Sequence, residues 1–578
     1  MNYKQIYEEW MNNPYFDEET RKELAAIAGD EKEIEERFYA DLEFGTAGLR
    51  GIIGAGINRM NIYVVRRATQ GLANYIKKQG GEEKGVVIAY DSRRMSPEFS
   101  EEAALCLAAN GIKAYRFESL RPTPELSFAV RHLGCIAGIN VTASHNPPEY
   151  NGYKVYWEDG AQITPPHDSG IMGEVKAIAD LSTCKTMDKE DAIRQGLYVT
   201  IGKEVDDVYI EELKKLVIRK DCIEKYGKDI KIVYTPLHGT GNIPARRVLK
   251  EIGFENVYVV PEQELPDGEF PTVSYPNPEA EEAFTLALKL AKEKDADLVL
   301  ATDPDADRLG VYVKDSKTGE YITLTGNMSG CLLADYEISQ MKEMNGSLPE
   351  DGALIKTIVT SNLADEIAKG HNVQLIEVLT GFKYIGQQIL NFETTGKGTY
   401  LFGFEESYGC LIGTHARDKD AIVATMALCE AAAYFKSQGK TLWDAMVDMY
   451  DKYGYCIDAI QSVSLKGIEG LAKISEIMET LRNNTPAKIG KYDVLSARDY
   501  KADTIKNLAT GEVTPTGLPS SNVIYYDMSE SAWLCVRPSG TEPKVKFYYG
   551  VKGTSLEEAQ KLSKELGEDV LAMINKML

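Results

Sequence analysis

The sequence lacks the features that mark secreted, membrane-spanning and zinc-binding proteins. Its first residues, Met1-Asn2-Tyr3-Lys4-Gln5, do not form the apolar core of a signal peptide, and no uninterrupted apolar run is long enough to span a bilayer. The nine cysteines are scattered without a Cys-x-x-Cys pair, and several lie inside apolar runs, as buried reduced thiols do. We therefore expect a cytoplasmic protein with neither a disulfide framework nor a zinc site.

Basic residues are also scarce relative to acidic ones. Lysine and arginine together number 65, against 88 aspartates and glutamates, so the net charge is −23. This balance argues against nucleic acid and anionic membranes as partners, because both select positively charged surfaces. A small anionic substrate remains compatible with it, provided that the basic ligands are gathered in one local cleft.

The chain has 578 residues, which is too long for a single hydrophobic core. A rhythm of strand, helix and strand begins at Val86–Tyr90 and restarts near residues 230 and 353, which predicts successive α/β units. After about residue 455 the pattern changes to that of a small α+β domain with an antiparallel sheet. We expect four domains, at residues 1–205 (including N-terminal helices), 206–322, 323–452 and 453–578.

One loop combines a hydroxyl, an imidazole and an amine. The segment from Val141 to Tyr156 reads VTASHNPPEYNGYKVY and follows a buried strand, after which Asn and two prolines forbid regular structure. The hydroxyl of Ser144 is thereby held at the end of a strand with His145 beside it, and Lys154 follows on a second short strand. The glycine-dense turn Phe44–Gly51 adds Arg50, which can bind an anion.

Three aspartates alternate at the end of another buried strand. Asp303, Asp305 and Asp307 are so close in sequence that their carboxylates would repel one another strongly unless a divalent cation lay among them. An EF-hand is excluded, because its loop requires glycine and glutamate where Arg308 and Lys314 stand. With few ligands and no cage, Mg²⁺ completed by a phosphate oxygen fits best.

Two further loops suit a phosphorylated sugar. Phe402–Gly409 places carboxylates and a hydroxyl in a tight turn, where they can accept and donate hydrogen bonds to sugar hydroxyls. Residues 537–541, Arg-Pro-Ser-Gly-Thr, combine a guanidinium, two hydroxyls and small residues, as a phosphate-binding turn does. A hydroxyl, a metal loop, a polyol loop and a phosphate loop, each in its own domain, together predict one site for a phosphorylated sugar.

Two common alternatives do not fit these loops. The turn Gly239-Thr240-Gly241 lacks the third glycine of a dinucleotide-binding fingerprint. A serine esterase needs glycines on both sides of its nucleophile, and Thr142 and Asn146 occupy those positions around Ser144.

In this order, the motifs TASHNP, DPDADR, GFEES and RPSGTEP resemble those of the α-D-phosphohexomutase family, most closely its long phosphoglucomutase/phosphopentomutase branch. The resemblance extends over almost the whole chain. It implies four domains around a central cleft, three related α/β domains with mixed sheets and a smaller C-terminal α+β domain. It also implies an isomerase that acts on small sugar phosphates with Mg²⁺, and with glucose 1,6-bisphosphate as activator and intermediate.

The resemblance further implies roles for individual residues. The catalytic group would comprise Ser144 as the phosphorylated residue, with His145, Lys154, Arg50 and Arg308. The metal ligands would be Ser144, Asp303, Asp305 and Asp307. The substrate-binding group would comprise Glu405, Ser407 and Lys383 near the sugar, Arg417 and Lys419 as phosphate ligands, and Arg537, Ser539, Gly540 and Thr541 around the non-reacting phosphate.

The reaction so implied interconverts glucose 1-phosphate and glucose 6-phosphate, and three points stay open. Bifunctional phosphomannomutase/phosphoglucomutase relatives carry a histidine just after the sugar loop, where this sequence has Tyr408-Gly409, so the general base is His145, Lys154 or a residue not identified. The substrate could instead be a pentose or mannose phosphate. Outside the family, a metal-dependent phosphatase or a non-catalytic sugar-phosphate sensor would use the same residues. The sequence makes no prediction of an oligomeric state.

Overall fold

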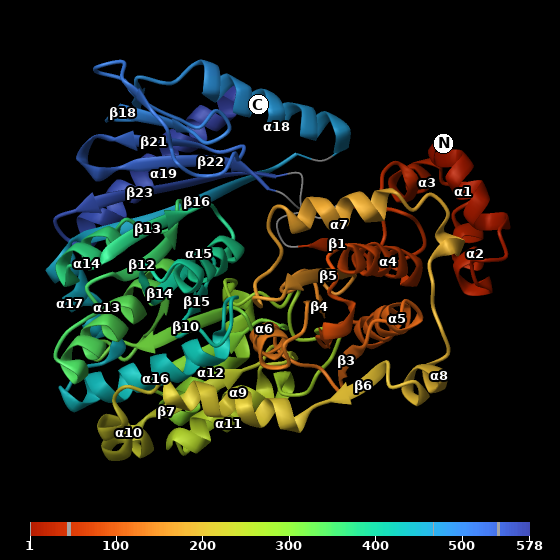
Figure 1. Cartoon of the computed structure of the whole chain (residues 1–578). Coiled ribbons are helices and arrows are strands. Elements are labelled where there is room, and N and C mark those ends of the chain that lie inside the picture. Colours follow the sequence, from red (N-terminus) through yellow and green to blue (C-terminus); the bar gives the residue numbers. More distant parts are fainter. Residues whose placement is uncertain (1, 43–47, 466, 540–543) are drawn as a thin grey trace.

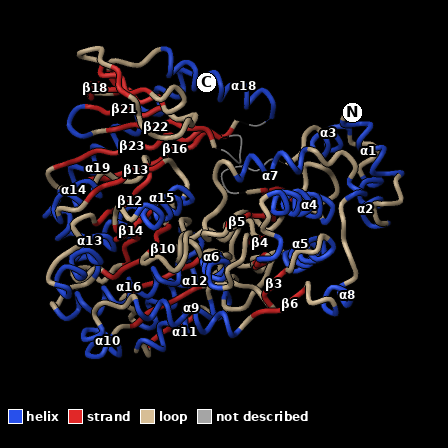
Figure 2. The backbone as a smooth tube through the Cα atoms, viewed as in Figure 1, coloured by secondary structure: helices blue, strands red, loops and turns tan. Residues whose placement is uncertain are grey.

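The computed structural model describes residues 2–42, 48–465, 467–539 and 544–578. Four β-sheets follow one another along the chain, each built from its own stretch of sequence, and helices flank them (Figures 1 and 2). We refer to the four sheets with their helices as the first to fourth domains. The predicted architecture is confirmed: three α/β domains with mixed sheets precede a C-terminal domain with an antiparallel sheet.

The first sheet has the strand order β1-β5-β4-β2-β3-β6. Its strands are β1 (Leu49–Ile52), β2 (Val86–Tyr90), β3 (Ala114–Phe117), β4 (Ala137–Val141), β5 (Tyr150–Trp157) and β6 (Tyr198–Ile201). The strands β4, β2, β3 and β6 are parallel, whereas β5 is antiparallel to both β4 and β1. Every residue of β2 and β4 is buried, which explains why both read as mostly apolar runs. The helices of this domain are α4 (Ile62–Lys78), α5 (Ser96–Ala109), α6 (Thr123–His132), α7 (His167–Lys176) and α8 (Lys189–Arg194).

Three short helices precede the first sheet: α1 (Tyr3–Asn12), α2 (Glu18–Ala26) and α3 (Glu31–Phe38). They lie at the outer side of the first domain (Figure 1). An aromatic cluster joins them to α4, in which Trp10 stacks on Phe16 and both contact Tyr63. None of these contacts reaches the loops that carry the predicted chemistry.

The second and third sheets repeat the plan of the first. Their strand orders are β11-β10-β9-β7-β8 and β13-β12-β14-β15, with parallel pairs among β9, β7 and β8 and among β13, β12 and β14. The strands are β7 (Lys231–Thr235), β8 (Asn256–Val259), β9 (Leu298–Thr302), β10 (Leu309–Lys314), β11 (Tyr321–Leu324), β12 (Gly352–Thr357), β13 (Gln374–Val378), β14 (Thr399–Glu405) and β15 (Gly409–Leu411). The helices are α9 (Lys203–Lys215), α10 (Lys220–Tyr226), α11 (Asn242–Ile252), α12 (Thr285–Lys294), α13 (Gly326–Asn345), α14 (Leu363–His371), α15 (Phe382–Thr395), α16 (Ala421–Ser437) and α17 (Leu442–Tyr453).

The fourth domain is built on an antiparallel sheet of order β16-β23-β22-β21-β18-β19-β20, and β17 pairs with β18 beside this path. Its strands are β16 (Tyr455–Ser464), β17 (Lys488–Ile489), β18 (Tyr492–Asp499), β19 (Thr504–Asn507), β20 (Val513–Thr514), β21 (Ile524–Met528), β22 (Trp533–Pro538) and β23 (Lys544–Gly553). Its helices are α18 (Gly467–Asn483) and α19 (Leu556–Met577).

The hydrophobic cores show which domains are packed as one body. A single large cluster runs from one face of the first sheet through the second domain into the third. The fourth domain has a core of its own, and it meets the third through a smaller cluster that includes Val359, Tyr525 and Trp533 and through Cys456 at the margin of the large cluster. The fourth domain is therefore the most independently packed of the four.

Two further observations bear on the composition. None of the helices in the described ranges combines the length and the apolar composition needed to cross a bilayer. All nine cysteines are buried and free.

Candidate functional site

A cavity of about 860 Å³ lies where the four domains meet. Each domain contributes one of the predicted loops to its wall, with Ser144 from the first, Asp307 from the second, Glu405 from the third and Arg537 from the fourth. These loops follow β4, β9, β14 and β22, so all four lie at the carboxyl ends of strands, where α/β sheets place their ligands.

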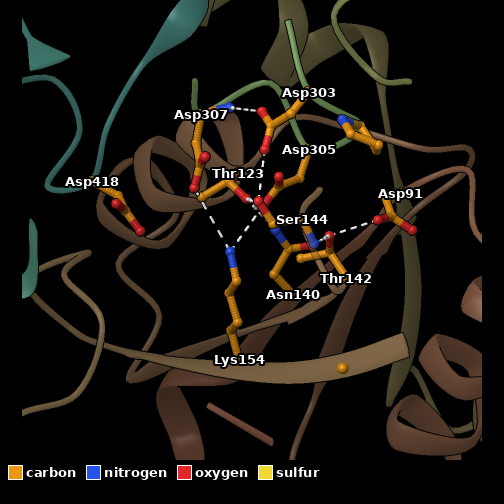
Figure 3. A network of polar contacts seen from close by, with 12 residues as sticks. Asp91, Thr123, Asn140, Thr142, Ser144, Lys154, Asp303, Asp305, Asp307 and Asp418 are labelled. Carbon is orange, nitrogen blue, oxygen red and sulfur yellow. Dashed lines mark hydrogen bonds and ion pairs between the residues drawn. The ribbon is translucent and has the colours of Figure 1, made fainter. Parts of the chain in front are cut away.

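Ser144 is held rigidly at the end of β4. Its backbone has a φ of 52°, a left-handed conformation that is uncommon for serine. The backbone N–H of Ser144 donates to Oγ1 of Thr142 at 2.9 Å, and this hydroxyl donates in turn to Asp91 at 2.6 Å. The side chain of Ser144 donates to Oδ2 of Asp303 at 2.6 Å (Figure 3). The predicted hydroxyl and the first predicted carboxylate are thus in direct contact.

The three aspartates after β9 form a buried cluster. One oxygen from each of Asp303, Asp305 and Asp307 lies within 4.8 Å of the others, and all three side chains are almost fully buried. Ala306 has a φ of 50°, and the N–H groups of Asp307 and Arg308 both donate to Oδ1 of Asp303 at 3.1 Å. This tight turn makes alternate side chains converge.

This cluster fits a divalent cation with oxygen ligands. Among the described atoms, the buried Oδ1 atoms of Asp305 and Asp307 have no hydrogen-bond partner, which is costly for a carboxylate unless a cation contacts it. Burial and the charges of Asp305 and Asp307 together raise the pKa of Asp303 well above its ordinary value. A cluster made up of carboxylate oxygens alone, with no imidazole nitrogen or thiolate sulfur in it, suits a hard cation such as Mg²⁺.

Two lysines neutralise part of this negative charge. Nζ of Lys154 lies 2.9 Å from Oδ2 of Asp305 and 3.7 Å from Oδ2 of Asp307, and Nζ of Lys419 lies 3.2 Å from Oδ2 of Asp307. Burial alone would lower the pKa of Lys154, but the charges of Asp305 and Asp307 outweigh it and raise this pKa. For Asp305 the effects reverse: burial would raise its pKa, but Lys154 and hydrogen bonds lower it. Both lysines are therefore cations beside the aspartate cluster.

His145 and two arginines line the same part of the cavity as Ser144. Nδ1 of His145 lies 3.3 Å from Oγ of Ser144. Burial, followed by the charges of Arg308 and Arg50, lowers the pKa of His145 well below its ordinary value, so its imidazole is neutral at pH 7. Arg308 is paired with Glu279 at 2.8 Å, and Arg50 donates to Oδ1 of Asn146 at 2.7 Å.

The loop after β14 presents a carboxylate and a hydroxyl together. Oγ of Ser407 donates to Oε1 of Glu405 at 2.9 Å, and Nζ of Lys419 lies 3.8 Å from the same oxygen. Tyr408 has a φ of 63°, and its carbonyl accepts the N–H of Leu309 at 2.9 Å, which ties this loop to the second domain. Both polar groups line the cavity and can bind adjacent sugar hydroxyls.

The opposite end of the cavity belongs to the fourth domain. Arg537 and Ser539 line it, and the predicted ligands Gly540 and Thr541 lie outside the described residues. Arg537 pairs in register with Lys546 of β23, which also lines the cavity. Burial and the charge of Arg537 lower the pKa of Lys546. Two neighbouring cations destabilise each other in this way, and an anion bound between them would relieve the repulsion.

Two of the predicted substrate ligands do not line this cavity. Arg417 is fully buried and contacts Glu393 and the backbone carbonyls of Thr414 and Ala416. Lys383 is the second residue of α15 and follows the lining residues Thr380, Gly381 and Phe382, but it is not itself among the lining residues.

Three other residues contribute to the site without having been predicted. Lys546 faces Arg537 across a strand pair, Glu279 holds Arg308, and the hydroxyl of Thr123 donates to Oδ2 of Asp305 at 2.7 Å. The sequence offers a signal for Thr123, since it follows a strand of the first sheet at its carboxyl end. Lys546 is positioned by the register of two strands and Glu279 by a long loop, and the residues around them in the sequence give no comparable signal.

Three stretches of the chain match models of one known protein family. Residues 41–182, 207–319 and 325–453 match three family models, described as phosphoglucomutase/phosphomannomutase, alpha/beta/alpha domains I, II and III. The phosphoglucomutase of Staphylococcus saprophyticus is 37% identical over 528 residues, which cover 91% of this chain and 94% of that protein. The phosphoglucomutase of Staphylococcus aureus (strain MRSA252) is 36% identical over 537 residues, covering 92% and 94%.

Solved structures share the fold. A putative phosphomannomutase from Thermus thermophilus has a TM-score of 0.68 at 22% identity and covers 93% of this chain and 99% of its own. The pp63/parafusin phosphoglucomutase from Paramecium, in an open form, has a TM-score of 0.66 at 19% identity and covers 92% and 96%.

Proposed function

Because this chain belongs to the phosphoglucomutase/phosphomannomutase family of α-D-phosphohexomutases, we propose that it is a phosphoglucomutase that interconverts glucose 1-phosphate and glucose 6-phosphate through a phosphorylated Ser144. The observation that carries the proposal is the 2.6 Å contact between Oγ of Ser144 and Asp303, inside a cavity lined by all four domains. The Staphylococcus relatives, similar over nine-tenths of the chain, are phosphoglucomutases and support glucose as the sugar.

The aspartate cluster would hold Mg²⁺ together with the phosphorylated Ser144. Asp303, Asp305 and Asp307 supply the carboxylates, and two of these carry the buried oxygens that lack another partner among the described atoms. Bound there, the metal would draw negative charge from the transferring phosphoryl group. Lys154, Lys419 and Arg308 surround the same position and stabilise the charge on the equatorial oxygens as the phosphoryl group moves.

In the first half of the reaction, phosphorylated Ser144 is the donor. The free hydroxyl of glucose 1-phosphate attacks the phosphorus, the bond from phosphorus to Oγ of Ser144 breaks, and glucose 1,6-bisphosphate forms. In the second half the bisphosphate lies in the opposite orientation. Oγ of Ser144 then attacks the phosphorus of the 1-phosphate, the sugar oxygen leaves, and glucose 6-phosphate is released.

The attacking sugar hydroxyl must lose a proton in the first half, and the leaving oxygen must regain one in the second. His145 is neutral at pH 7 and can accept a proton directly, whereas Lys154 must first lose the proton that Asp305 and Asp307 stabilise. The pH dependence of kcat in His145→Gln and Lys154→Met separates the two. The variant that lacks the base should lose the acidic limb of the profile, because a general base must be deprotonated to act.

The rest of the cavity holds the substrate by groups that do not react. Glu405 and Ser407 bind adjacent sugar hydroxyls. Arg537, Ser539 and Lys546 bind the non-reacting phosphate. The guanidinium of Arg537 can donate two parallel hydrogen bonds to this phosphate, which a single amine cannot do. Gly540 and Thr541, outside the described residues, would extend the same turn. Lys383 and Arg417, which do not line this cavity, would act only if α15 or the loop before α16 moved.

Water must be excluded while the phosphoserine exists, because it would otherwise hydrolyse. We assign this task to closure of the fourth domain, which has its own core and meets the third through a small cluster. A boundary near residue 452, as the sequence predicts, would put this joint just before β16. Small-angle scattering should show compaction when substrate is added, and unchanged scattering would contradict closure.

With nine free cysteines and a phosphorylated metabolite as substrate, we place the enzyme in the cytoplasm.

A coupled isomerisation assay tests the function. Glucose 1-, mannose 1- and ribose 1-phosphate are compared at equal concentration with Mg²⁺ and a catalytic amount of glucose 1,6-bisphosphate. We expect the highest kcat/KM for glucose 1-phosphate, and no isomerisation or phosphate incorporation in Ser144→Ala. Preference for ribose or mannose phosphate would assign the chain to another activity of the family. Release of inorganic phosphate would indicate a phosphatase, and binding without phosphate incorporation a sensor.

A further inference from the structure

Arg93, just after β2, is a fully buried arginine that contacts the backbone of the Ser144 loop. Its guanidinium donates to the carbonyl of Ser144 at 2.6 Å and lies beside the carboxylate of Asp91. It also donates to three other carbonyls of this loop, those of Asn146, Pro147 (2.8 Å) and Tyr150 (3.1 Å). Only a planar group with several donors can serve four acceptors at once, so lysine cannot replace it.

Asp91 and Thr142 fix the same loop through a second set of contacts. The carboxylate of Asp91 accepts from the hydroxyls of Thr142 and Ser96, and the hydroxyl of Thr142 accepts the N–H of Ser144 (Figure 3). Ser144 is therefore fixed at its N–H by Thr142 and at its carbonyl by Arg93. These two contacts maintain the left-handed φ that aims its hydroxyl at Asp303.

A loop of the second domain covers Arg93. The ring of Phe270 lies 5.1 Å from the guanidinium carbon, and Phe270 is itself fully buried with a φ of 47°, a strained conformation for an aromatic residue. Gly268 of this loop is so close that a Cβ would lie 2.6 Å from the backbone nitrogen of Arg94. His238 fastens both ends of the loop, through the carbonyl of Leu265 and the hydroxyl of Thr272.

We propose that Arg93 and Phe270 form a clamp that positions Ser144 for phosphoryl transfer. This clamp keeps the Ser144 loop at a fixed position relative to the aspartates of the second domain. Arg93 contacts backbone carbonyls and not the reacting atoms, so it is a positioning residue. Phe270 and the aspartates belong to the same domain, so the contact of Phe270 with Arg93 links the metal loop to the Ser144 loop a second time. This inference rests on the proposed function, because it requires that Ser144 carry the phosphoryl group.

Arg93→Lys tests the clamp, with Arg94→Lys as its matched control. Arg94 is the neighbouring arginine, is half exposed, and donates to one carbonyl of the same loop, that of Pro148. In Arg93→Lys, kcat should fall about 100-fold, as expected for a misplacement of the reacting atom by about 1 Å. KM for glucose 1-phosphate should stay close to that of the wild type, because Arg537 and the sugar loop are untouched. Arg94→Lys should leave both constants unchanged.

Phe270→Leu provides a second measurement that does not remove the buried charge. It should lower kcat less than Arg93→Lys does, again with KM unchanged. In single-turnover experiments, enzyme labelled with phosphate on Ser144 should transfer the label to glucose 1-phosphate more slowly in both variants, and Arg93→Met should be slower than Arg93→Lys. A purely structural role would instead lower the melting temperature without separating kcat from KM.

The outcomes distinguish this inference from the proposed function. If the wild-type enzyme neither isomerises glucose 1-phosphate nor takes label on Ser144, the proposed function fails. If the wild type does both and Arg93→Lys matches Arg94→Lys, the clamp alone is wrong. Should Arg93→Lys fail to fold, Phe270→Leu decides: a lower kcat at unchanged KM supports the clamp, and an unchanged kcat overturns it.

Discussion

The side chain of Ser144 donates a hydrogen bond of 2.6 Å to Oδ2 of Asp303, although 159 positions separate the two residues. A second contact repeats this junction between the first and second domains, because Thr123 donates to Asp305 with both its hydroxyl, at 2.7 Å, and its N–H, at 2.9 Å. The aspartate loop is thus held by the first domain at two points. This explains why the hydroxyl of Ser144, from the first sheet, and the three carboxylates that follow the second sheet's β9 lie together beside the cavity.

Thr123→Val should weaken Mg²⁺ binding by about 10- to 100-fold, the usual effect of removing a hydrogen bond to a metal ligand. Valine keeps the shape of threonine but cannot donate to Asp305, so this carboxylate loses a contact that orients its other oxygen towards the cluster. Isothermal titration with Mg²⁺ measures the change. The rise of the melting temperature with Mg²⁺ should shrink in parallel, since ligand binding stabilises the folded state by mass action.

Thr425→Val is the matched control for this prediction. Thr425 is buried in α16, and its hydroxyl has no hydrogen-bond partner among the described residues. Its replacement should leave Mg²⁺ affinity unchanged and stability equal or higher, because an unsatisfied buried hydroxyl is lost. Equal Mg²⁺ affinity in Thr123→Val and the wild type would contradict the assigned role of Thr123.

Lys546→Met should raise KM for glucose 1-phosphate with little change in kcat. A hydrogen bond to a charged group contributes about 1.5–3 kcal/mol, so the increase should be about 10- to 100-fold. Lys546 lies opposite Arg537 at the end of the cavity assigned to the non-reacting phosphate, and this binding is equal in ground and transition states. Steady-state kinetics measures both constants. Lys552→Met, on the same strand but beside Glu366 of α14, should change neither.

The sequence was sufficient to predict the four domains and the loops that line the cavity. Each motif follows an apolar run, and in α/β sheets the carboxyl end of a strand is where ligands bind, so Ser144, Asp303 and Glu405 could be assigned to one site. The close spacing of the aspartates predicted a metal cluster for an electrostatic reason that holds in any fold.

Contacts set by register and by side-chain direction could not be predicted. Arg417 and Lys419 are neighbours in one basic segment, yet Lys419 reaches Asp307 whereas Arg417 points away to Glu393. Lys546 meets Arg537 only because β22 and β23 pair in one particular register, and a shift by one residue would turn it to the other face. Glu279 reaches Arg308 from a long loop that has no periodic pattern.

Glu406→Gln should make KM for glucose 1-phosphate less dependent on pH. Burial, with the charge of Glu405, raises the pKa of Glu406 to about 7, so this cavity-lining group is mostly neutral below pH 7 and negative above it. A like charge near the incoming phosphate costs about 1 kcal/mol, or roughly fivefold in affinity. KM of the wild type should therefore rise between pH 6 and 8 more than that of the variant. Taking the ratio of the two KM values at each pH cancels the effect of substrate ionisation. As a control, Glu320→Gln, at an exposed position, should show the same pH dependence of KM as the wild type.

Glu337→Gln should stabilise the protein at pH 8 but not at pH 5. Glu337 of α13 is only 2% exposed, and burial together with the charge of Glu430 raises its pKa well above the ordinary value. Since the folded state then binds its proton more tightly than the unfolded state, the free energy of unfolding falls as pH rises from the unfolded pKa through the folded one. Glutamine removes this loss, with a gain bounded by the desolvation cost of a buried polar group, about 1–3 kcal/mol. Melting temperatures at both pH values, with exposed Glu343→Gln on the same helix as control, measure the effect. An equal change in melting temperature at pH 5 and at pH 8 would show that Glu337 is not the titrating group.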